Sequence, residues 1–357
     1  YYGDKGCVEH TQENLDADGN GFKLPYIHEI DGCQVPDWVS NTVWYQIFPE
    51  RFANGNPNLT PVGAREWDAA IAPNIDDFFG GDLQGIIDHL DYLKNLGITG
   101  LYLCPIFEAT TNHKYDTTDY FEIDRHFGDK EVFRNLVEEA HKRGIKIMLD
   151  AVFNHIGYQS AQWQDVLKNG EKSPYKDWFH IQEFPVTEDK LQNPRQLPYH
   201  TFAFASYMPK LNTANPEVRD YLLSVATYWI ENFDIDAWRL DVANEIDHQF
   251  WKDFRKAVLA KKPDLYILGE IWHTSQPWLQ GDEFHAVMNY PLSESIKDYF
   301  LRQHKKTEQF ISEINSQSMY YKQQISEVMF NLLDSHDSER ILTTAKGNIQ
   351  HVKAALT

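Results

Sequence analysis

The chain has 357 residues, of which 42% are hydrophobic and 14% aromatic, so it can bury a large core as one α/β domain with an insertion or as two domains. Its formal net charge of −20 argues against nucleic acid and anionic membrane surfaces as partners. No apolar run reaches membrane-spanning length. Of the three cysteines, Cys7 and Cys33 could pair, but the odd number fits a reducing, cytoplasmic location better than a disulfide framework.

The first 38 residues are polar and rich in Gly, Asp and Asn, and they predict a lead-in from a preceding N-terminal domain. Within them, the stretch DADGNG, which begins at Asp16, is similar to the start of a calcium loop. The twelfth position of such a loop requires a glutamate, and here it is Ile27. We therefore interpret this stretch as an ordinary turn.

From Val39 onward, apolar strand-like runs alternate with amphipathic helix-like segments. Gly97 and Gly144 end two predicted helices, and Pro216 precedes a third. The predicted strands are 43–47, 98–106, 145–153, a strand starting at 236, 265–271, 284–288 and 328–333, and the main predicted helices are 83–96, 131–143, 216–232 and 249–261. The number of these strand–helix units and the lack of a Gly-rich phosphate loop favour a (β/α)8 TIM barrel, with the eighth strand truncated, over a doubly wound open sheet.

One connection is much longer than the others. About sixty residues rich in Trp, Tyr, Phe and Pro separate Asn154 from Asn215, more than an ordinary βα loop contains. We therefore expect a small inserted subdomain, subdomain B, over the mouth of the barrel. The predicted domains are 1–38 as the lead-in, 39–154 as the first part of the barrel, 155–212 as subdomain B and 213–357 as the second, incomplete part of the barrel.

Polar side chains occur at the predicted carboxyl ends of four strands, where a (β/α)8 barrel has its active site. They are Asp150, Asn154 and His155 at the third strand, Arg239 and Asp241 at the fourth, Glu270 and Trp272 at the fifth, and Asp334, His336 and Asp337 at the seventh. There is no Ser-His-Asp order and no strand-end lysine or thiol. Carboxylates of this kind favour glycoside chemistry, in which one carboxylate attacks and another protonates.

Arg239 and Asp241 lie two residues apart, so on an extended strand both side chains point to the same face. We expect the guanidinium to keep the pKa of Asp241 low and its carboxylate ionised, as a carboxylate nucleophile requires. This segment alone also permits a structural ion pair at a strand end.

Four segments, DAVFNH from Asp150, AWRLDVANE from Ala237, GEIW from Gly269 and LLDSHD from Leu332, stand in the order found in the retaining α-amylase family, glycoside hydrolase family 13. The sequence particularly resembles the neopullulanase, cyclomaltodextrinase and maltogenic amylase branch, because MPKLN, which starts at Met208, is similar to the marker of that branch. The resemblance extends from about Val39 to the end of the chain.

The resemblance implies three catalytic residues. Asp241 would be the nucleophile that forms a β-glucosyl ester, and Glu270 would be the general acid and then the base. We expect the position of Glu270 between Leu268 and Trp272 to raise its pKa. Asp337 would bind sugar hydroxyls and help distort the ring. The implied activity is hydrolysis of α-1,4 bonds, and in some members also α-1,6 bonds, in cyclomaltodextrins, maltodextrins, pullulan or starch.

The resemblance also implies substrate-binding residues. Tyr115, in the loop after the second strand, would stack beneath the reacting glucose, although an aromatic residue that caps this loop is the alternative. His155 and His336 would donate hydrogen bonds to sugar hydroxyls, although a lone histidine is more often structural. Arg239 would orient Asp241.

On the leaving-group side of the cleft, the resemblance implies roles for Asn244, Glu245 and Trp272, which would influence the tolerance of α-1,6 bonds. We expect Asp150 and Asn154 to brace the site rather than contact the reacting atoms.

A calcium ion is the only cofactor that the resemblance implies, and no organic cofactor is expected. Its ligands would come from two loops, and they are Asn54, Asn56, Asn58, Gly80 and Asp82. Oxygen donors suit a hard cation, but an asparagine at position 56, where relatives can have an aspartate, should lower the affinity. A plain Asn/Gly-rich turn is the alternative.

Two other functions are compatible with the same residues. An α-glucan transglycosylase would use the same ester and pass the sugar to another sugar, whereas a non-catalytic amylase-like binding protein would be expected to lack part of the acid set. A catalytic metal centre has no HExxH motif to support it. The expected partners are an α-glucan oligosaccharide or cyclodextrin and, through a preceding N-terminal domain, a second copy in a homodimer.

Overall fold

The computed structural model describes residues 2–3, 6–7, 9–16, 32–66, 71–186, 195 and 197–357. The chain divides into two compact units: the barrel unit, Pro36–Glu270, and the second unit, Tyr1–Val35 together with Ile271–Thr357. Most of the stretch that begins at Asp16 and is similar to a calcium loop lies outside the described residues. Within the described part of the chain, no helix is long and apolar enough to cross a membrane.

A parallel sheet organises the barrel unit. Its strands are β3 (Trp44–Ile47), β4 (Gly100–Leu103), β7 (Lys146–Ala151), β8 (Ala237–Leu240) and β9 (Tyr266–Gly269), and each pairs in parallel with the next in that order. A doubly wound sheet would reverse its strand order, and this sheet does not. The consecutive order confirms the predicted (β/α)8 TIM-barrel fold class.

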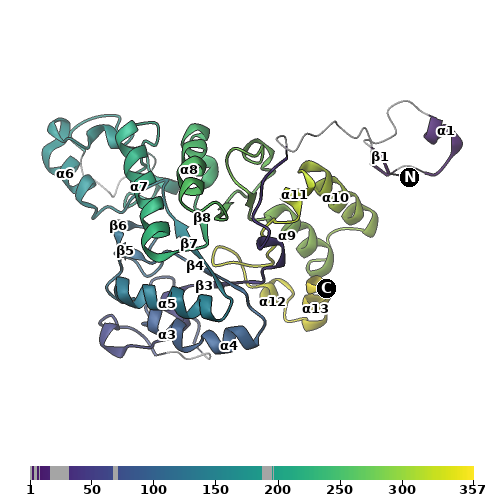
Figure 1. Cartoon of the computed structure of the whole chain (residues 1–357), viewed down its shortest axis with the longest axis horizontal. Coiled ribbons are helices and arrows are strands. Elements are labelled where there is room, and N and C mark those ends of the chain that lie inside the picture. The colour runs from purple at the N-terminus through teal and green to yellow at the C-terminus, as the bar shows by residue number, and fades with distance from the viewer. Residues whose placement is uncertain are drawn as a thin grey trace. The chain divides into compact units, whose positions relative to one another are not determined.

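Helices connect these strands, and Figure 1 labels all but the first of them, on either side of the sheet. They are α2 (Pro49–Phe52), α3 (Leu83–Asp88), α4 (Leu90–Asn95), α5 (Lys130–Lys142), α7 (Pro216–Phe233) and α8 (His248–Lys261). The buried residues of α5 recur with helical spacing, as Phe133, Leu136, Val137 and Ala140 show. Asn215 and Asp247 cap α7 and α8 by accepting backbone hydrogen bonds, which fixes where each helix begins.

The segment predicted as one helix, 83–96, is two helices that meet at His89. This residue has φ −107° and ψ 6°, outside the helical range, and its Nδ1 lies 2.7 Å from the carbonyl oxygen of Gly85. The side chain therefore competes for a carbonyl one turn back, which a pattern of apolar residues does not reveal.

Sequence reasoning also missed an antiparallel hairpin after β4. Its strands are β5 (Phe107–Ala109) and β6 (Thr117–Ile123), and Tyr115 lies in the loop between them. The hairpin therefore places the tyrosine that the resemblance assigned to the substrate.

The long connection after β7 is held together by isolated bridges and by an aromatic cluster. The helical segments in its described part are α6 (Ala161–Asn169), η4 (Gly170–Lys172), η5 (Lys176–Trp178) and η7 (Phe202–Phe204). Trp163 is fully buried, and its ring lies 4.7 Å from that of Phe179 and 4.6 Å from that of Tyr199. A segment with its own buried cluster fits the predicted subdomain B, whose boundaries stay a prediction.

The second unit is mainly helical in its described part. It contains β1 (Tyr2–Gly3), β2 (Gly6–Cys7), α1 (Gln12–Asp16), η9 (Gln276–Trp278), β10 (Ala286–Val287), α9 (Tyr290–Ile296), η10 (Lys297–Leu301), α10 (Thr307–Tyr320), α11 (Gln323–Ser326), α12 (Ile341–Thr344) and α13 (Ile349–Leu356). Leu301, Ala345 and Ala355 form a small core. The predicted strand 328–333 is reduced to one parallel bridge between Met288 and Phe330.

Candidate active site

Arg239 lies at the centre of a buried charge cluster in the barrel unit and is itself fully buried. Its Nη1 donates to Asp241 Oδ1 at 2.7 Å and to the two oxygens of Asp150 at 2.9 and 3.0 Å. Its Nη2 lies 3.0 Å from Glu270 Oε2. The parallel register explains this convergence, because Arg239 of β8 pairs with Asp150 of β7, and β9 delivers Glu270 beside them.

Asp150 braces the cluster from β7. Its Oδ2 accepts hydrogen bonds from the hydroxyls of Tyr102 at 2.6 Å and Tyr115 at 2.8 Å. Burial raises the pKa of Asp150, while Arg239 and the two tyrosine hydroxyls act to lower it. This geometry agrees with the expected bracing role. Sequence reasoning missed Tyr102, which lies in an all-buried strand and looks like an ordinary core residue.

Asp241 follows β8 and is 5% exposed. Burial raises its pKa well above the ordinary value; Arg239 opposes this, and the charges of Glu270 and Asp150 add to it. The expectation of a low pKa was therefore wrong. The main physical reason is the burial of the carboxyl group. In addition, one guanidinium serves three buried carboxylates, so the charges of Glu270 and Asp150 offset part of the lowering by Arg239.

Glu270 directly follows β9, and the loop after Asp241 donates two backbone hydrogen bonds to Glu270. The backbone N–H of Val242 donates to Glu270 Oε2 at 2.8 Å, and that of Ala243 donates to the Glu270 carbonyl at 3.2 Å. Val242 has φ +46°, which is strained for a β-branched residue. The structure thus holds the predicted acid and the predicted nucleophile in one short network.

Tyr115 is fixed from two sides. Its hydroxyl donates to Asp150, and its carbonyl oxygen lies 3.0 Å from Nε2 of His155. The His155 ring stacks on Phe202 with centroids 5.0 Å apart, and burial lowers the pKa of His155 to about 3, so this imidazole is neutral at physiological pH. His155 positions Tyr115 in this structure, and its predicted hydrogen bond to a sugar stays a prediction.

Next to this network, Lys210 of the MPKLN segment links two loops. Its Nζ donates to Asn154 Oδ1 at 2.5 Å and to Glu245 Oε2 at 2.9 Å. Asn244 and Glu245, in η8 (Ala243–Glu245), are exposed, as residues expected to meet a leaving group should be. Sequence reasoning used MPKLN only as a marker and gave Lys210 no role, because its partners are distant in sequence.

The remaining predicted site residues lie in the second unit. Asp337 has a side chain 39% exposed, and its Oδ2 lies 3.2 Å from Nε2 of His336. Trp272 is 48% exposed, and its ring stacks on that of Tyr290 with centroids 3.7 Å apart and an interplanar angle of 8°. An exposed carboxylate and an open aromatic face suit contact with sugar. Their convergence with Asp241 and Glu270 stays a prediction.

Among the predicted calcium ligands, the side-chain amide of Asn54 donates to the Thr60 hydroxyl at 2.7 Å, and Asp82 is fully buried. Its carboxylate accepts backbone hydrogen bonds from Gly55, Asn56 and Gly85, and Asn56 Oδ1 accepts one from Asn58. The donor set is all oxygen and fits a hard cation in kind, but Asp82 supplies its only negative charge. Among the described residues, those of this loop included, no group of three or more His, Cys, Asp or Glu is arranged to hold a metal.

Comparison with known proteins identifies the family. The family model described as alpha amylase, catalytic domain, matches residues 46–357. An intracellular maltogenic amylase of Bacillus subtilis is 57% identical over 356 residues, which cover 100% of this chain and 59% of that protein. A cyclomaltodextrinase of Geobacillus thermopakistaniensis is 60% identical over 332 residues, covering 93% of this chain and 55% of that protein. The chain thus spans less than two thirds of the length of these relatives.

Solved structures agree. A structure titled cyclomaltodextrinase superposes with a TM-score of 0.88 at 53% identity, covering 94% of this chain and 57% of that one. The cyclic α-maltosyl-(1→6)-maltose hydrolase of Arthrobacter globiformis superposes with a TM-score of 0.86 at 44% identity, covering 90% of this chain and 72% of that one. The family model, the relatives and the parallel strand order agree, and the chain belongs to the α-amylase family, glycoside hydrolase family 13.

Proposed function

We propose that the protein is a retaining α-glucan hydrolase with Asp241 as nucleophile and Glu270 as general acid and base. The observation that carries this proposal is the shared guanidinium of Arg239, which contacts both carboxylates, at 2.7 and 3.0 Å. Two carboxylates on one guanidinium are close together. This favours the spacing of retaining glycosidases, about 5–5.5 Å, over the wider spacing of about 6.5–9.5 Å that leaves room for an attacking water in inverting ones.

In the first step, an ionised Asp241 oxygen attacks C1 of the glucose, the bond from C1 to the leaving oxygen breaks, and Glu270 gives its proton to that oxygen. In the second step, Glu270 takes a proton from water, the water oxygen bonds to C1, and the ester to Asp241 breaks. Arg239 orients the nucleophile and offsets its charge. Asp337 would bind hydroxyls of the same sugar and stabilise the distorted ring.

Short and cyclic maltodextrins are the proposed substrates, with pullulan and starch as further candidates. The names of the relatives support this choice, since they include maltogenic amylase, cyclomaltodextrinase and neopullulanase. One relative is named as intracellular, which supports a proposed cytoplasmic location. The expected homodimer stays a proposal, which the molar mass of the full-length protein in solution would test.

The test compares the full-length wild type with Asp241→Asn and Glu270→Gln on β-cyclodextrin, pullulan and starch. Each substitution keeps the shape of the side chain but removes the charge or the proton that the mechanism needs. We expect both to lose at least about a thousandfold in kcat, because each removes an essential step. Wild-type rates in the Asp241→Asn protein would overturn the proposal.

A further inference from the structure

The ammonium group of Lys210 has three oxygen partners from two separate loops. It donates to Asn154 Oδ1 at 2.5 Å, to Glu245 Oε2 at 2.9 Å and to the Glu245 carbonyl at 3.2 Å. An ammonium has three donors, so every donor of Lys210 is used. The side chain is 19% exposed, which makes its contacts less screened than those of a surface pair. Lys210 therefore acts as a tether.

The tether joins three parts of the barrel unit. The backbone around Lys210 runs antiparallel to the segment that follows β7, since Lys210 forms a bridge with His155 and Leu211 donates to the Asn154 carbonyl at 3.0 Å. A second link lies nearby, where the Thr213 hydroxyl donates to Asp247 Oδ2 at 2.7 Å. The end of the inserted segment is thus fixed both to the segment that follows β7 and to the loop after β8.

The loop that carries Glu245 lies on the leaving-group side of the site. Val242 and Ala243 of this loop donate hydrogen bonds to Glu270. A general acid faces the leaving oxygen, so a loop built against it borders the place where the leaving sugar departs. By microscopic reversibility, a sugar that attacks the covalent intermediate enters at that same place.

We propose that Lys210 is a positioning residue that holds Glu245 against the incoming sugar and thereby sets the ratio of sugar transfer to hydrolysis. This inference rests on the proposed function. Glu245 has a side chain 41% exposed, so its carboxylate can meet a sugar hydroxyl while Lys210 restricts its rotamers. Without the contacts of Lys210, the Glu245 side chain is no longer held in one position to bind the acceptor sugar. Attack by water does not need such a partner.

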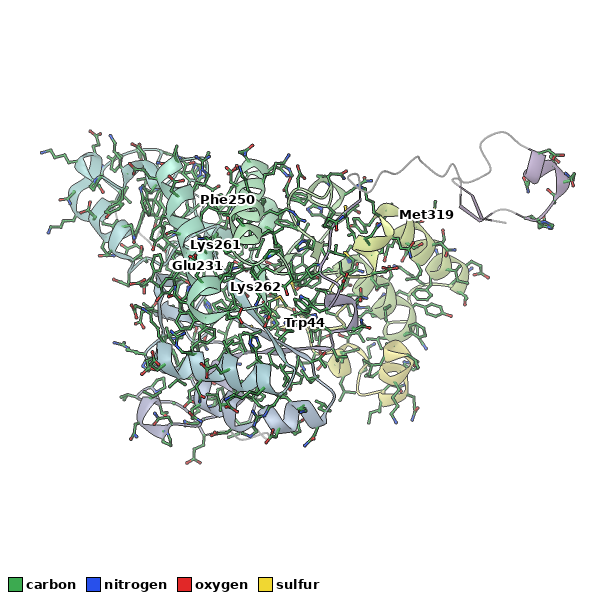
Figure 2. The ribbon with its side chains drawn as sticks, in the orientation of Figure 1. Trp44, Glu231, Phe250, Lys261, Lys262 and Met319 are labelled. Carbon is green, nitrogen blue, oxygen red and sulfur yellow. The ribbon has the colours of Figure 1, made fainter. Side chains whose placement is uncertain are left out.

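The experiment uses the full-length protein, an aryl α-maltoside as donor and maltose as acceptor. Release of the aryl alcohol reports formation of the covalent intermediate, and product analysis gives the ratio of transfer to hydrolysis. The variants are Lys210→Met, Lys210→Arg, Glu245→Ala and the double variant Lys210→Met with Glu245→Ala. Lys261→Met is the matched control, because it breaks an exposed pair at 2.6 Å with Glu231 (Figure 2).

In Lys210→Met we expect the ratio of transfer to hydrolysis to fall about threefold, the effect of losing one partly exposed charged pair, whatever its rate of aryl release. Lys210→Arg should keep most of the ratio. The double variant should match Glu245→Ala, because Lys210 acts through Glu245. Lys261→Met should match the wild type.

Two outcomes would overturn this proposal. One is a ratio of transfer to hydrolysis in Lys210→Met that equals the wild-type ratio. The other is a double variant in which the separate effects of Lys210→Met and Glu245→Ala on this ratio multiply. If Lys210→Met does not fold, a ratio in Lys210→Arg that is as low as in Glu245→Ala would also overturn it. A wild-type protein that releases no aryl alcohol would instead contradict the proposed function itself.

Discussion

Replacing Arg239 by methionine tests the charge cluster most severely. The substitution preserves much of the side-chain volume but leaves Asp150, Asp241 and Glu270 without the cation that lies 2.7–3.0 Å from each of them. Removing one partner from a buried ion pair typically lowers the free energy of unfolding by about 3–5 kcal/mol, and here it leaves three buried carboxylates that repel one another. We therefore expect a loss of at least about 3 kcal/mol in the free energy of unfolding near pH 7.

The sign of the pH dependence gives a sharper test. Without Arg239, the folded-state pKa values of the three carboxyls should lie above their unfolded values, so the folded state binds more protons. Stability then falls as pH rises, by up to about 1.4 kcal/mol per pH unit for each proton. The gap between the variant and the wild type should therefore be smaller at pH 5 than at pH 8.

The assay is urea unfolding of the full-length protein at both pH values. The matched control is Arg219→Met, because Arg219 lies 3.4 Å from Asp253 and both side chains are 32% exposed. That control should lose less than about 1 kcal/mol, with little dependence on pH. An Arg239→Met protein as stable as the wild type, or one whose deficit does not change with pH, would refute the account of the cluster.

Further expectations concern pH and calcium. Burial raises the pKa of Asp241, and the nucleophile must be ionised to react. On acidification, kcat/KM should therefore fall at a higher pH than it would with an exposed aspartate. A pH profile in which kcat/KM falls only near pH 4 would contradict this. Burial raises the pKa of Asp236, but the hydrogen bond from His141 and the charge of Lys262 hold it below its ordinary value. Asp236→Asn should therefore lower the free energy of unfolding, measured in urea, by about 3 kcal/mol at pH 7. This loss should become smaller below about pH 4, where the wild-type carboxylate also begins to take up a proton. An equal loss at pH 7 and below pH 4 would contradict this account of Asp236. EDTA should lower the unfolding temperature of the full-length protein slightly, and added calcium should restore it. Both changes should be larger in Asn56→Asp, which adds a negative ligand. No change in either protein would contradict the predicted calcium site.

The sequence predicted those parts of the molecule that depend on local patterns. Helices α5 and α7 follow from apolar residues at helical spacing and from clear start and stop signals. The pairing of Arg239 with Asp241 follows from their spacing of two on an extended strand. Parallel β7, β8 and β9 then bring their carboxyl ends to one edge, so the meeting of Asp241 with Glu270 could also be anticipated.

What the sequence did not reveal are contacts between distant segments. Tyr102 looks like core until its hydroxyl is seen on Asp150, 48 residues away. Lys210 gains its role only from Glu245, 35 residues further along. The raised pKa of Asp241 also depends on the folded structure, because burial of the carboxyl raises it most and the charges of Glu270 and Asp150 add to this effect, although Arg239 lies next to it.

The most direct test of the account is to trap the covalent intermediate. A 5-fluoro-α-glycosyl fluoride slows hydrolysis of the ester, so peptide mass spectrometry of the full-length protein can locate the sugar. The account predicts one glycosyl group per chain on the peptide that contains Asp241, and none in Asp241→Asn. Rapid turnover of α-glucans with a label on another residue, or with none at any time, would contradict it.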